Sequence, residues 1–147
     1  MTGSPAATER SAPTDACLNE RVDRERAPTL RVRDAMTPRP KTLAADATVG
    51  MLRATFENPH VAIALLADAE RFAGAIARDQ VHDSLADDAP ARTLVSRRIP
   101  TIEPDAPLTD ALAVLDARGE TRLVVVEGER LVGLLCLTRD RLGFCQS

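Results

Sequence analysis

An internal repeat is the feature of this 147-residue sequence that most restricts its fold. When the chain is aligned with itself at a spacing of 59 residues, no gap is needed across some 35 positions. Turn, helix and strand signals coincide, as in the pairs Asp46 with Asp105 and Gly74 with Gly133. A unit of roughly 55 residues is marginally stable alone. The repeat therefore predicts two similar units that share one fold.

Both copies show the same order of secondary-structure signals, which predicts an α+β fold built from two β-α-β-β-α units. In the first copy, we expect a strand at 41–43, a helix at 48–57, a hairpin from 61–66 and 72–77, and a helix at 79–85. In the second copy, we expect a strand at 100–103, a helix at 108–118, a hairpin from 123–126 and 131–137, and a helix at 138–142. Short helical segments at 32–36 and 91–96 precede the two copies.

The repeat divides the chain into a first unit at 29–88 and a second unit with a short C-terminal tail at 89–147. Residues 1–28 precede the repeat, and their large aliphatic side chains are Met1, Leu18 and Val22. Because so little apolar surface cannot offset the entropy of ordering, we expect residues 1–28 to be mostly disordered. A short helix that packs through Leu18 and Val22 is the alternative.

Composition excludes several classes of function. Nineteen basic against 22 acidic residues give a net charge of −3, and the longest basic run is Arg97-Arg98, so a nucleic-acid partner is not expected. With three Phe and no Tyr or Trp, the chain cannot build a base-stacking platform. The longest apolar runs are too short to span a membrane, and no signal peptide is visible. We expect a cytoplasmic protein, and the preference for Arg over Lys suggests a bacterial source.

No catalytic constellation is present in the sequence, so we do not expect an enzyme. The three cysteines, Cys17, Cys136 and Cys145, form no CxxC pair and have no nearby histidine pair. This spacing argues against a zinc site and a disulfide framework. Pairing of Cys136 with Cys145 under oxidation, as a thiol-responsive switch, is a minor alternative.

Several motifs resemble the CBS (cystathionine-β-synthase) domain. Residues 32–38 (VRDAMTP) resemble the opening of the domain, 42–49 and 101–108 its strand-to-helix element, and 122–126 with 130–135 its hairpin. The resemblance extends over about residues 30–142. It implies a tandem CBS pair, or Bateman module, with pseudo-twofold symmetry. Two small sheets would pack face to face with flanking helices, and two clefts would lie between the units.

In many CBS pairs such clefts bind AMP, ATP or S-adenosylmethionine through the signature G-h-h-[ST]-x-x-D, in which h is a hydrophobic residue. Both units depart from this signature. In the second unit the hydroxyl of Thr138 comes two positions late and Asp140 one position late. In the first unit Ala77 replaces the hydroxyl and Asp79 comes one position early. The resemblance makes Asp79 and Asp140 candidates for the ribose hydroxyls, whereas helix capping is the alternative.

The resemblance also suggests the remaining contacts of an adenosine ligand. Arginine matches phosphate geometry well, although each of these arginines could equally be a solvated charge. The adenine would rest on aliphatic side chains because the chain lacks suitable aromatic residues. The candidates are Arg78, Arg122 and Arg139 for phosphate, Thr37, Thr101 and Thr138 for polar contacts, and Val61, Ile99 and Leu123 for adenine.

We therefore expect a stand-alone regulatory module that senses an adenosine-containing ligand (AMP, ADP, ATP or S-adenosylmethionine) in a cleft between its units. The resemblance implies a homodimer that acts on a protein the sequence does not identify. No cofactor is required, and no metal site is expected. Because both signatures are altered, a dimerisation or protein-interaction module that does not bind nucleotides remains the alternative.

Overall fold

The computed structural model describes residues 21–95 and 100–145. The candidate Ile99 and the expected disorder of residues 1–20 lie outside this range. The first part of the chain forms β1 (Arg21–Asp23), η3 (Arg24–Thr29), α1 (Val32–Ala35), β2 (Thr37–Pro38), β3 (Leu43–Ala44), α2 (Val49–Phe56), β4 (Ile63–Asp68), β5 (Arg71–Ala77) and η4 (Arg78–Gln80). The second part forms η5 (Ala91–Leu94), β6 (Thr101–Ile102), α3 (Leu108–Arg118), β7 (Arg122–Glu127), β8 (Arg130–Cys136) and β9 (Gly143–Cys145).

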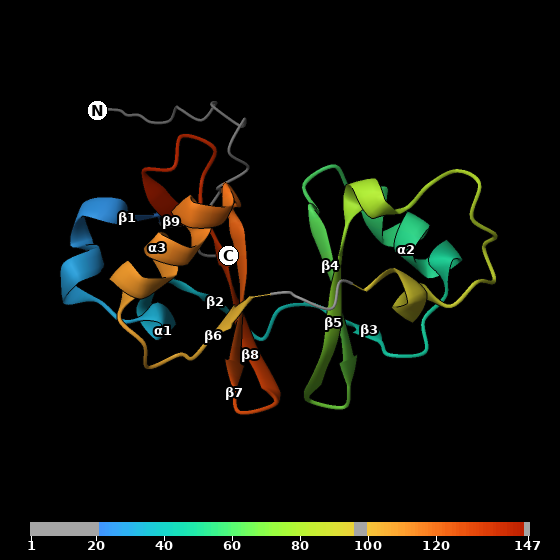
Figure 1. Cartoon of the computed structure of the whole chain (residues 1–147), viewed down its shortest axis with the longest axis horizontal. Helices are drawn as coiled ribbons and strands as arrows, with labels where there is room; N and C mark the ends of the chain where they lie inside the picture. Colours follow the sequence, from blue (N-terminus) through green and yellow to red (C-terminus); the bar gives the residue numbers. More distant parts are fainter. Residues whose placement is uncertain (1–20, 96–99, 146–147) are drawn as a thin grey trace, which may run out of the picture.

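Two hairpins, β4–β5 and β7–β8, lie side by side in the centre of the molecule (Figure 1). Helix α2 lies outside the first hairpin, and α1 and α3 lie outside the second (Figure 1). The strand order is β3-β4-β5-β8-β7-β6, with β2 added to β8. A single residue pair, Arg71 with Arg130, joins the hairpins in this order. The predicted α+β architecture with outer helices is confirmed.

The contact between the hairpins has the 59-residue spacing of the repeat seen in the sequence. The amide of Phe72 donates to the carbonyl of Glu129, and the amide of Leu131 donates to the carbonyl of Glu70, each at 2.9 Å. These two bonds are equivalent, since their members are related by the 59-residue spacing. The two hairpins therefore meet about a pseudo-twofold axis.

Apolar side chains from both hairpins form a shared cluster at this axis. It contains Leu65 and Ala75 from the first hairpin and Val124 and Val126 from the second, all at most 7% exposed. Burying a side chain of the size of Leu or Val contributes about 1.5–3 kcal/mol. The cluster thus holds the units together, as the marginal size of each unit requires.

The segments that lead into the two hairpins are exchanged between the units. Val32 of α1 packs among the buried side chains of α3, and its amide donates to the carbonyl of Ala106 at 2.9 Å. Ala91 of η5 packs in the cluster of α2, and its amide donates to the carbonyl of Ala47 at 2.9 Å. These bonds are again equivalent in the repeat. The core clusters therefore do not follow the boundary expected between residues 88 and 89.

Residues 21–28 lie at the end of the segment 1–28 that was expected to be mostly disordered, and they form β1 and most of η3. Strand β1 pairs with β9, and Val22 is 6% exposed in the cluster of the second unit. Arg24 forms an ion pair with Asp116 of α3. The sequence does not show this contact, because pairing with a distant strand leaves no local sequence pattern.

Two predicted helices are wrong. Residues 138–142 form a turn, in which the Thr138 amide donates to the Gly143 carbonyl at 2.8 Å, and the chain continues as β9. Residues 79–85 contain the end of the 3-10 helix η4 and a turn closed by the bond from the Leu85 amide to the His82 carbonyl, because the Gln80 side chain accepts a bond from the Ala77 amide and donates one to the Leu94 carbonyl. At 138–142 the Asp140 carboxylate also accepts a bond from the Leu142 amide, so in both places a side chain that binds the backbone replaces the helical pattern.

We predict that Gly74→Ala destabilises the protein by about 1–3 kcal/mol, the usual cost of overpacking a core. Gly74 has a φ of +152°, and a β-carbon there would overlap the side chain of Val95. Gly119→Ala is the matched control, because its φ is +65° but its β-carbon would meet nothing within 4 Å. Urea denaturation should give a larger loss for Gly74→Ala. Equal losses for the two variants would contradict the packing described.

The hydrogen bonds of Asp116 indicate that the stability of the folded chain depends on pH. Hydrogen bonds from Arg24, then from Arg141, lower the pKa of Asp116 to about 2. Since the folded pKa lies below the ordinary value of 3.8, the stabilisation is present above about pH 4 and is lost as pH falls towards 2. We expect Asp116→Asn to be less stable than the wild type at neutral pH and to converge with it under acid in denaturation curves. A constant difference across this range would contradict the assignment.

Candidate ligand-binding cleft

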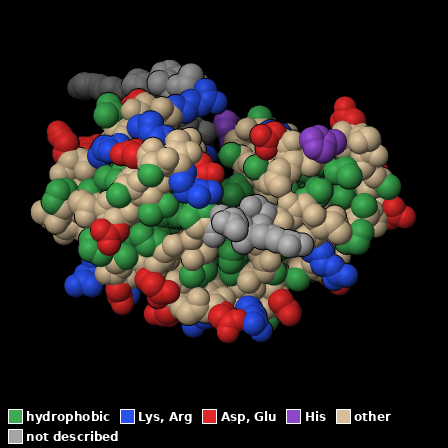
Figure 2. Space-filling view, in the orientation of Figure 1, with side chains coloured by type: hydrophobic (Ala, Val, Ile, Leu, Met, Phe, Trp, Pro, Cys, Tyr) green, Lys and Arg blue, Asp and Glu red, His purple; other side chains and the backbone are tan. Residues whose placement is uncertain are grey.

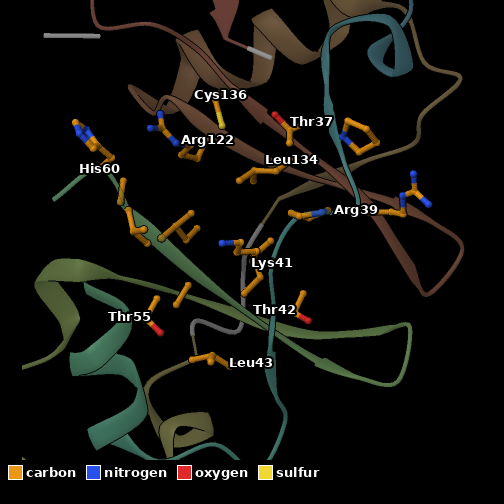
Figure 3. Close-up of a pocket in the computed structure, with 17 residues that line it drawn as sticks. Thr37, Arg39, Lys41, Thr42, Leu43, Thr55, His60, Arg122, Leu134 and Cys136 are labelled. Carbon is orange, nitrogen blue, oxygen red and sulfur yellow. The ribbon is translucent and has the colours of Figure 1, made fainter. Parts of the chain in front are cut away.

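A cleft with a volume of about 580 Å³ lies between the two units (Figure 3). Small-molecule sites commonly have volumes of about 300–1,000 Å³. The surface in Figure 2 is hollowed between the two halves of the molecule. The cleft is lined by Thr37, Pro38, Arg39, Pro40, Lys41, Thr42, Leu43, Thr55, His60, Val61, Ala62, Ile63, Ala64, Leu65, Arg122, Leu134 and Cys136.

Both units contribute walls to this cleft. The segment from residue 37 to 43 forms one wall, and residues 60–65, which lead into and begin β4, form a second. Arg122 of β7 together with Leu134 and Cys136 of β8 completes it from the second unit. A molecule bound here would touch both halves of the repeat.

The wall at residues 37–43 has a constrained backbone. Arg39 has a φ of +48°, a region that costs an L-residue about 1–2 kcal/mol. Pro38 and Pro40 fix the backbone on either side of it, and the Arg39 amide donates to the Val132 carbonyl at 3.2 Å. This fixed bend leads the chain from β2 to Lys41 along the cleft (Figure 3). Strained backbone of this kind concentrates at ligand sites.

The lining of the cleft is basic. It contains Arg39, Lys41, Arg122 and His60, and no Asp or Glu is among its lining residues. Among the described residues, no carboxylate forms an ion pair with Arg39, Lys41 or Arg122. In a chain with a net charge of −3, this is a local concentration of positive charge. Such a cleft favours an anionic ligand.

Three of the predicted site residues line the cleft: Thr37, Val61 and Arg122. The Arg122 guanidinium donates to the Thr121 hydroxyl at 3.1 Å, which helps to hold the side chain at the cleft. Sequence reasoning missed Arg39, Lys41 and His60. The pattern Thr-Pro-Arg-Pro-Lys, which contains the chain's one lysine, is the signal that could have drawn attention to the first two.

The Arg78 side chain, a candidate for binding phosphate, forms structural contacts within its own unit. Its guanidinium donates to the carbonyls of Phe56 at 2.7 Å, Asn58 at 2.8 Å and Val61 at 2.6 Å. It also lies over the Phe56 ring, 5.1 Å from its centroid. These contacts fasten the end of α2 to the chain that enters β4.

The other candidates do not line this cleft. Leu123 is 1% exposed within the core of the second unit, so it cannot support an adenine ring. Asp79, Thr101 and Arg139 are exposed elsewhere on the surface. Their proposed ligand contacts would require a site other than the cleft described.

Thr138 and Asp140 stabilise the turn before β9. The Thr138 hydroxyl donates to Asp140 Oδ1 at 2.5 Å, and the Leu142 amide donates to the same oxygen at 3.0 Å. Arg21 reaches Asp140 Oδ2 at 3.3 Å. The Thr138 bond, more than the others, lowers the pKa of Asp140. Both carboxylate oxygens therefore have partners within the chain, and the capping interpretation applies to a turn rather than to a helix.

The cysteines do not form the pair considered for a thiol switch. Cys145 is disulfide-bonded, contrary to the expectation of no disulfide, whereas Cys136 is a free thiol. Burial raises the pKa of the Cys136 thiol, which disfavours the reactive thiolate in the cleft.

Within residues 21–95 and 100–145, no group of side chains is arranged to hold a metal ion. No helix in this part of the chain is long and apolar enough to cross a membrane.

Comparison with known proteins shows which fold this is. The chain is similar to a Vibrio cholerae protein provisionally assigned to acetoin utilization (AcuB), with 22% identity, a TM-score of 0.66, and coverage of 73% of this chain and 84% of that one. The CBS domains of a transcriptional regulator from Streptococcus pneumoniae give 14% identity, a TM-score of 0.65, and coverage of 73% and 92%.

A third similar structure contains a ligand. It is the CBS domain of a bacterial CNNM/CorC family Mg²⁺ transporter in complex with ATP, with 17% identity, a TM-score of 0.64, and coverage of 77% of this chain and 85% of that one. Curated proteins give no significant match. The CBS domain family model matches residues 91–139, within the second unit. Residues 91–139 thus match the CBS domain, and the chain as a whole has the fold of CBS domain pairs.

Proposed function

We propose that this CBS pair is a regulatory module that binds a phosphate-bearing adenine nucleotide in the cleft between its units. The observation that carries the proposal is the basic lining of the cleft, with Arg39, Lys41, Arg122 and His60 and no carboxylate. Support also comes from the fold, since a CBS structure with a TM-score of 0.64 to this chain is a complex with ATP.

The charges of the cleft favour AMP, ADP or ATP over S-adenosylmethionine. Guanidinium and ammonium groups stabilise phosphate oxygens through charge-assisted hydrogen bonds. The sulfonium of S-adenosylmethionine carries a positive charge, for which the cleft lining offers no carboxylate. The phosphates would lie near Lys41 and Arg122, and aliphatic side chains such as Val61 and Leu134 would support the adenine.

Regulation follows from the two-sided construction of the cleft. A ligand that touches both units shifts the module towards the arrangement that it binds more tightly. We propose that this shift is transmitted to a separate protein, without catalysis, and that the module acts as a homodimer in the cytoplasm. Dimerisation is checked by light scattering of the purified chain with and without nucleotide.

Calorimetric titration of the purified chain tests the binding. We expect ATP, ADP or AMP to bind more tightly than S-adenosylmethionine. Arg122→Gln should weaken binding about 10- to 100-fold, because hydrogen bonds to charged groups contribute about 1.5–3 kcal/mol. Arg92→Gln is the matched control, since Arg92 is exposed on η5 and does not line the cleft.

Two outcomes would overturn the proposal. In the first, none of these nucleotides gives a heat of binding or raises the melting temperature. In the second, Arg122→Gln and Arg92→Gln weaken binding equally. The first outcome would favour the alternative of a protein-interaction module without a nucleotide. The engagement of Asp140 and Thr138 in their own turn is the observation that favours this alternative.

A further inference from the structure

The segment 21–29, which comprises β1 and η3, is fastened to the second unit at β9 (Figure 1). Strand β1 pairs with β9 through three residue pairs, in which Arg21 lies opposite Cys145 and Asp23 lies opposite Gly143. A β-carbon on Gly143 would overlap the Arg21 side chain, so the two strands approach each other closely there. A two-stranded sheet of this size is at best marginally stable in water. The segment therefore depends on further contacts to stay in place.

The further contacts of this segment lie at the edge of the second unit. Val22 and Ala27 are buried in the core cluster of that unit, and Arg24 forms a partly exposed ion pair with Asp116. The shared cluster at the pseudo-twofold axis contains no residue of the segment 21–29. Detachment of the segment would therefore leave the contact between the two hairpins in place.

A covalent bond begins at the last residue of β9. Of the two cysteines in the described residues, Cys136 is free and Cys145 is disulfide-bonded. The sequence contains one more cysteine, Cys17, four residues before β1. Four extended residues reach at most about 14 Å, and opposite residues of an antiparallel pair lie about 4.5–5.5 Å apart. Because Arg21 lies opposite Cys145, Cys17 is within reach of it.

We propose that Cys17 and Cys145 form a reversible disulfide, which fixes the segment 21–29 to the second unit when it is oxidised and releases the segment when it is reduced. This inference goes beyond the proposed function and needs no nucleotide. Disulfides of cytosolic proteins are usually transient and redox-sensing. Cys145 is half-buried, so a small reductant can reach its sulfur. Burial raises the pKa of the Cys136 thiol, which makes Cys136 a poor competitor in exchange.

The redox step is a thiol–disulfide exchange with a small cellular thiol such as glutathione. A thiolate of the reductant attacks one sulfur of the Cys17–Cys145 bond, the S–S bond breaks, and the other cysteine leaves as a thiolate that takes up a proton. A second reductant thiolate then resolves the mixed disulfide. The cysteine pair gains two electrons and two protons, and two reductant thiols become one disulfide. Oxidised glutathione drives the reverse reaction.

Thermal unfolding of the full chain with and without dithiothreitol measures what the bond contributes. Cys17 and Cys145 are 128 residues apart in the sequence. Reduction of a disulfide that closes so long a loop should lower the melting temperature by about 5–15 °C. Cys17→Ser and Cys145→Ser should each show the lower melting temperature without reductant and no further response to it. Cys136→Ser is the matched control, because its thiol is free, and it should respond to reductant as the wild type does.

Limited digestion with trypsin measures release of the segment. The bonds after Arg24 and Arg26 lie in η3, and Ala27 beside them is 2% exposed, so cleavage there requires the segment to leave its place. Since cleavage follows the population of the open form, its rate should increase at least about tenfold when the wild type is reduced. Gly143→Ala disturbs the pairing of β1 with β9 without altering a sulfur, and it should increase cleavage in the oxidised chain.

Equilibration with mixtures of reduced and oxidised glutathione separates a switch from a permanent cross-link. Mass spectrometry of peptides should show the Cys17–Cys145 bond opening and closing as the mixture changes, which supports the inference. A bond that stays closed in reduced glutathione, a covalent dimer linked through Cys145, or unchanged trypsin cleavage on reduction would each overturn it. None of these measurements involves a nucleotide, so failure of this inference leaves the proposed function untouched, and the reverse also holds.

Discussion

Each unit packs against the segment that leads into the hairpin of the other unit, α1 or η5. The rest of the structure depends on this exchange of segments. Val32 bonds to Ala106 in the other unit, and its repeat equivalent Ala91 bonds to Ala47. The ion pair between Arg33 and Asp105 adds to the first of these contacts. Because each unit completes the core of the other, neither has a full set of packing partners by itself. The shared cluster between the hairpins then sets the distance between the units, and so the width of the cleft.

The same exchange builds the cleft. After α1, Met36 lies against Gly133 of β8, where a β-carbon would overlap its sulfur. The chain then passes the strained Arg39 and enters the cleft with Lys41. The cleft wall is thereby joined to α1 and, through the buried cluster of the second unit, to Ala27 and Val22 of the N-terminal segment.

Much of the fold could be predicted from the sequence, because repetition and periodicity are local signals. The hairpins, α2 and α3 were predicted this way, whereas the pseudo-twofold symmetry was implied by the resemblance to the CBS pair. The exchange could not be predicted from such patterns, since the sequence of α1 does not show which unit it packs against. Asp105 illustrates this limit, because its carboxylate binds Arg33 of α1, which lies 72 residues earlier in the chain. The site was predicted less well, because Arg78 and Asp140 bind backbone and side-chain groups of their own chain, whereas Lys41 and His60 reach the cleft only through the path of the backbone.

Differential scanning calorimetry of the whole chain tests the central claim most directly, namely that the two repeated units form one cooperative structure through exchanged segments. The structure predicts a single unfolding transition whose calorimetric and van't Hoff enthalpies agree. Gly74→Ala, although it lies in the first unit, should shift this entire transition to lower temperature. Two separate transitions, with only one of them displaced by Gly74→Ala, would contradict the account.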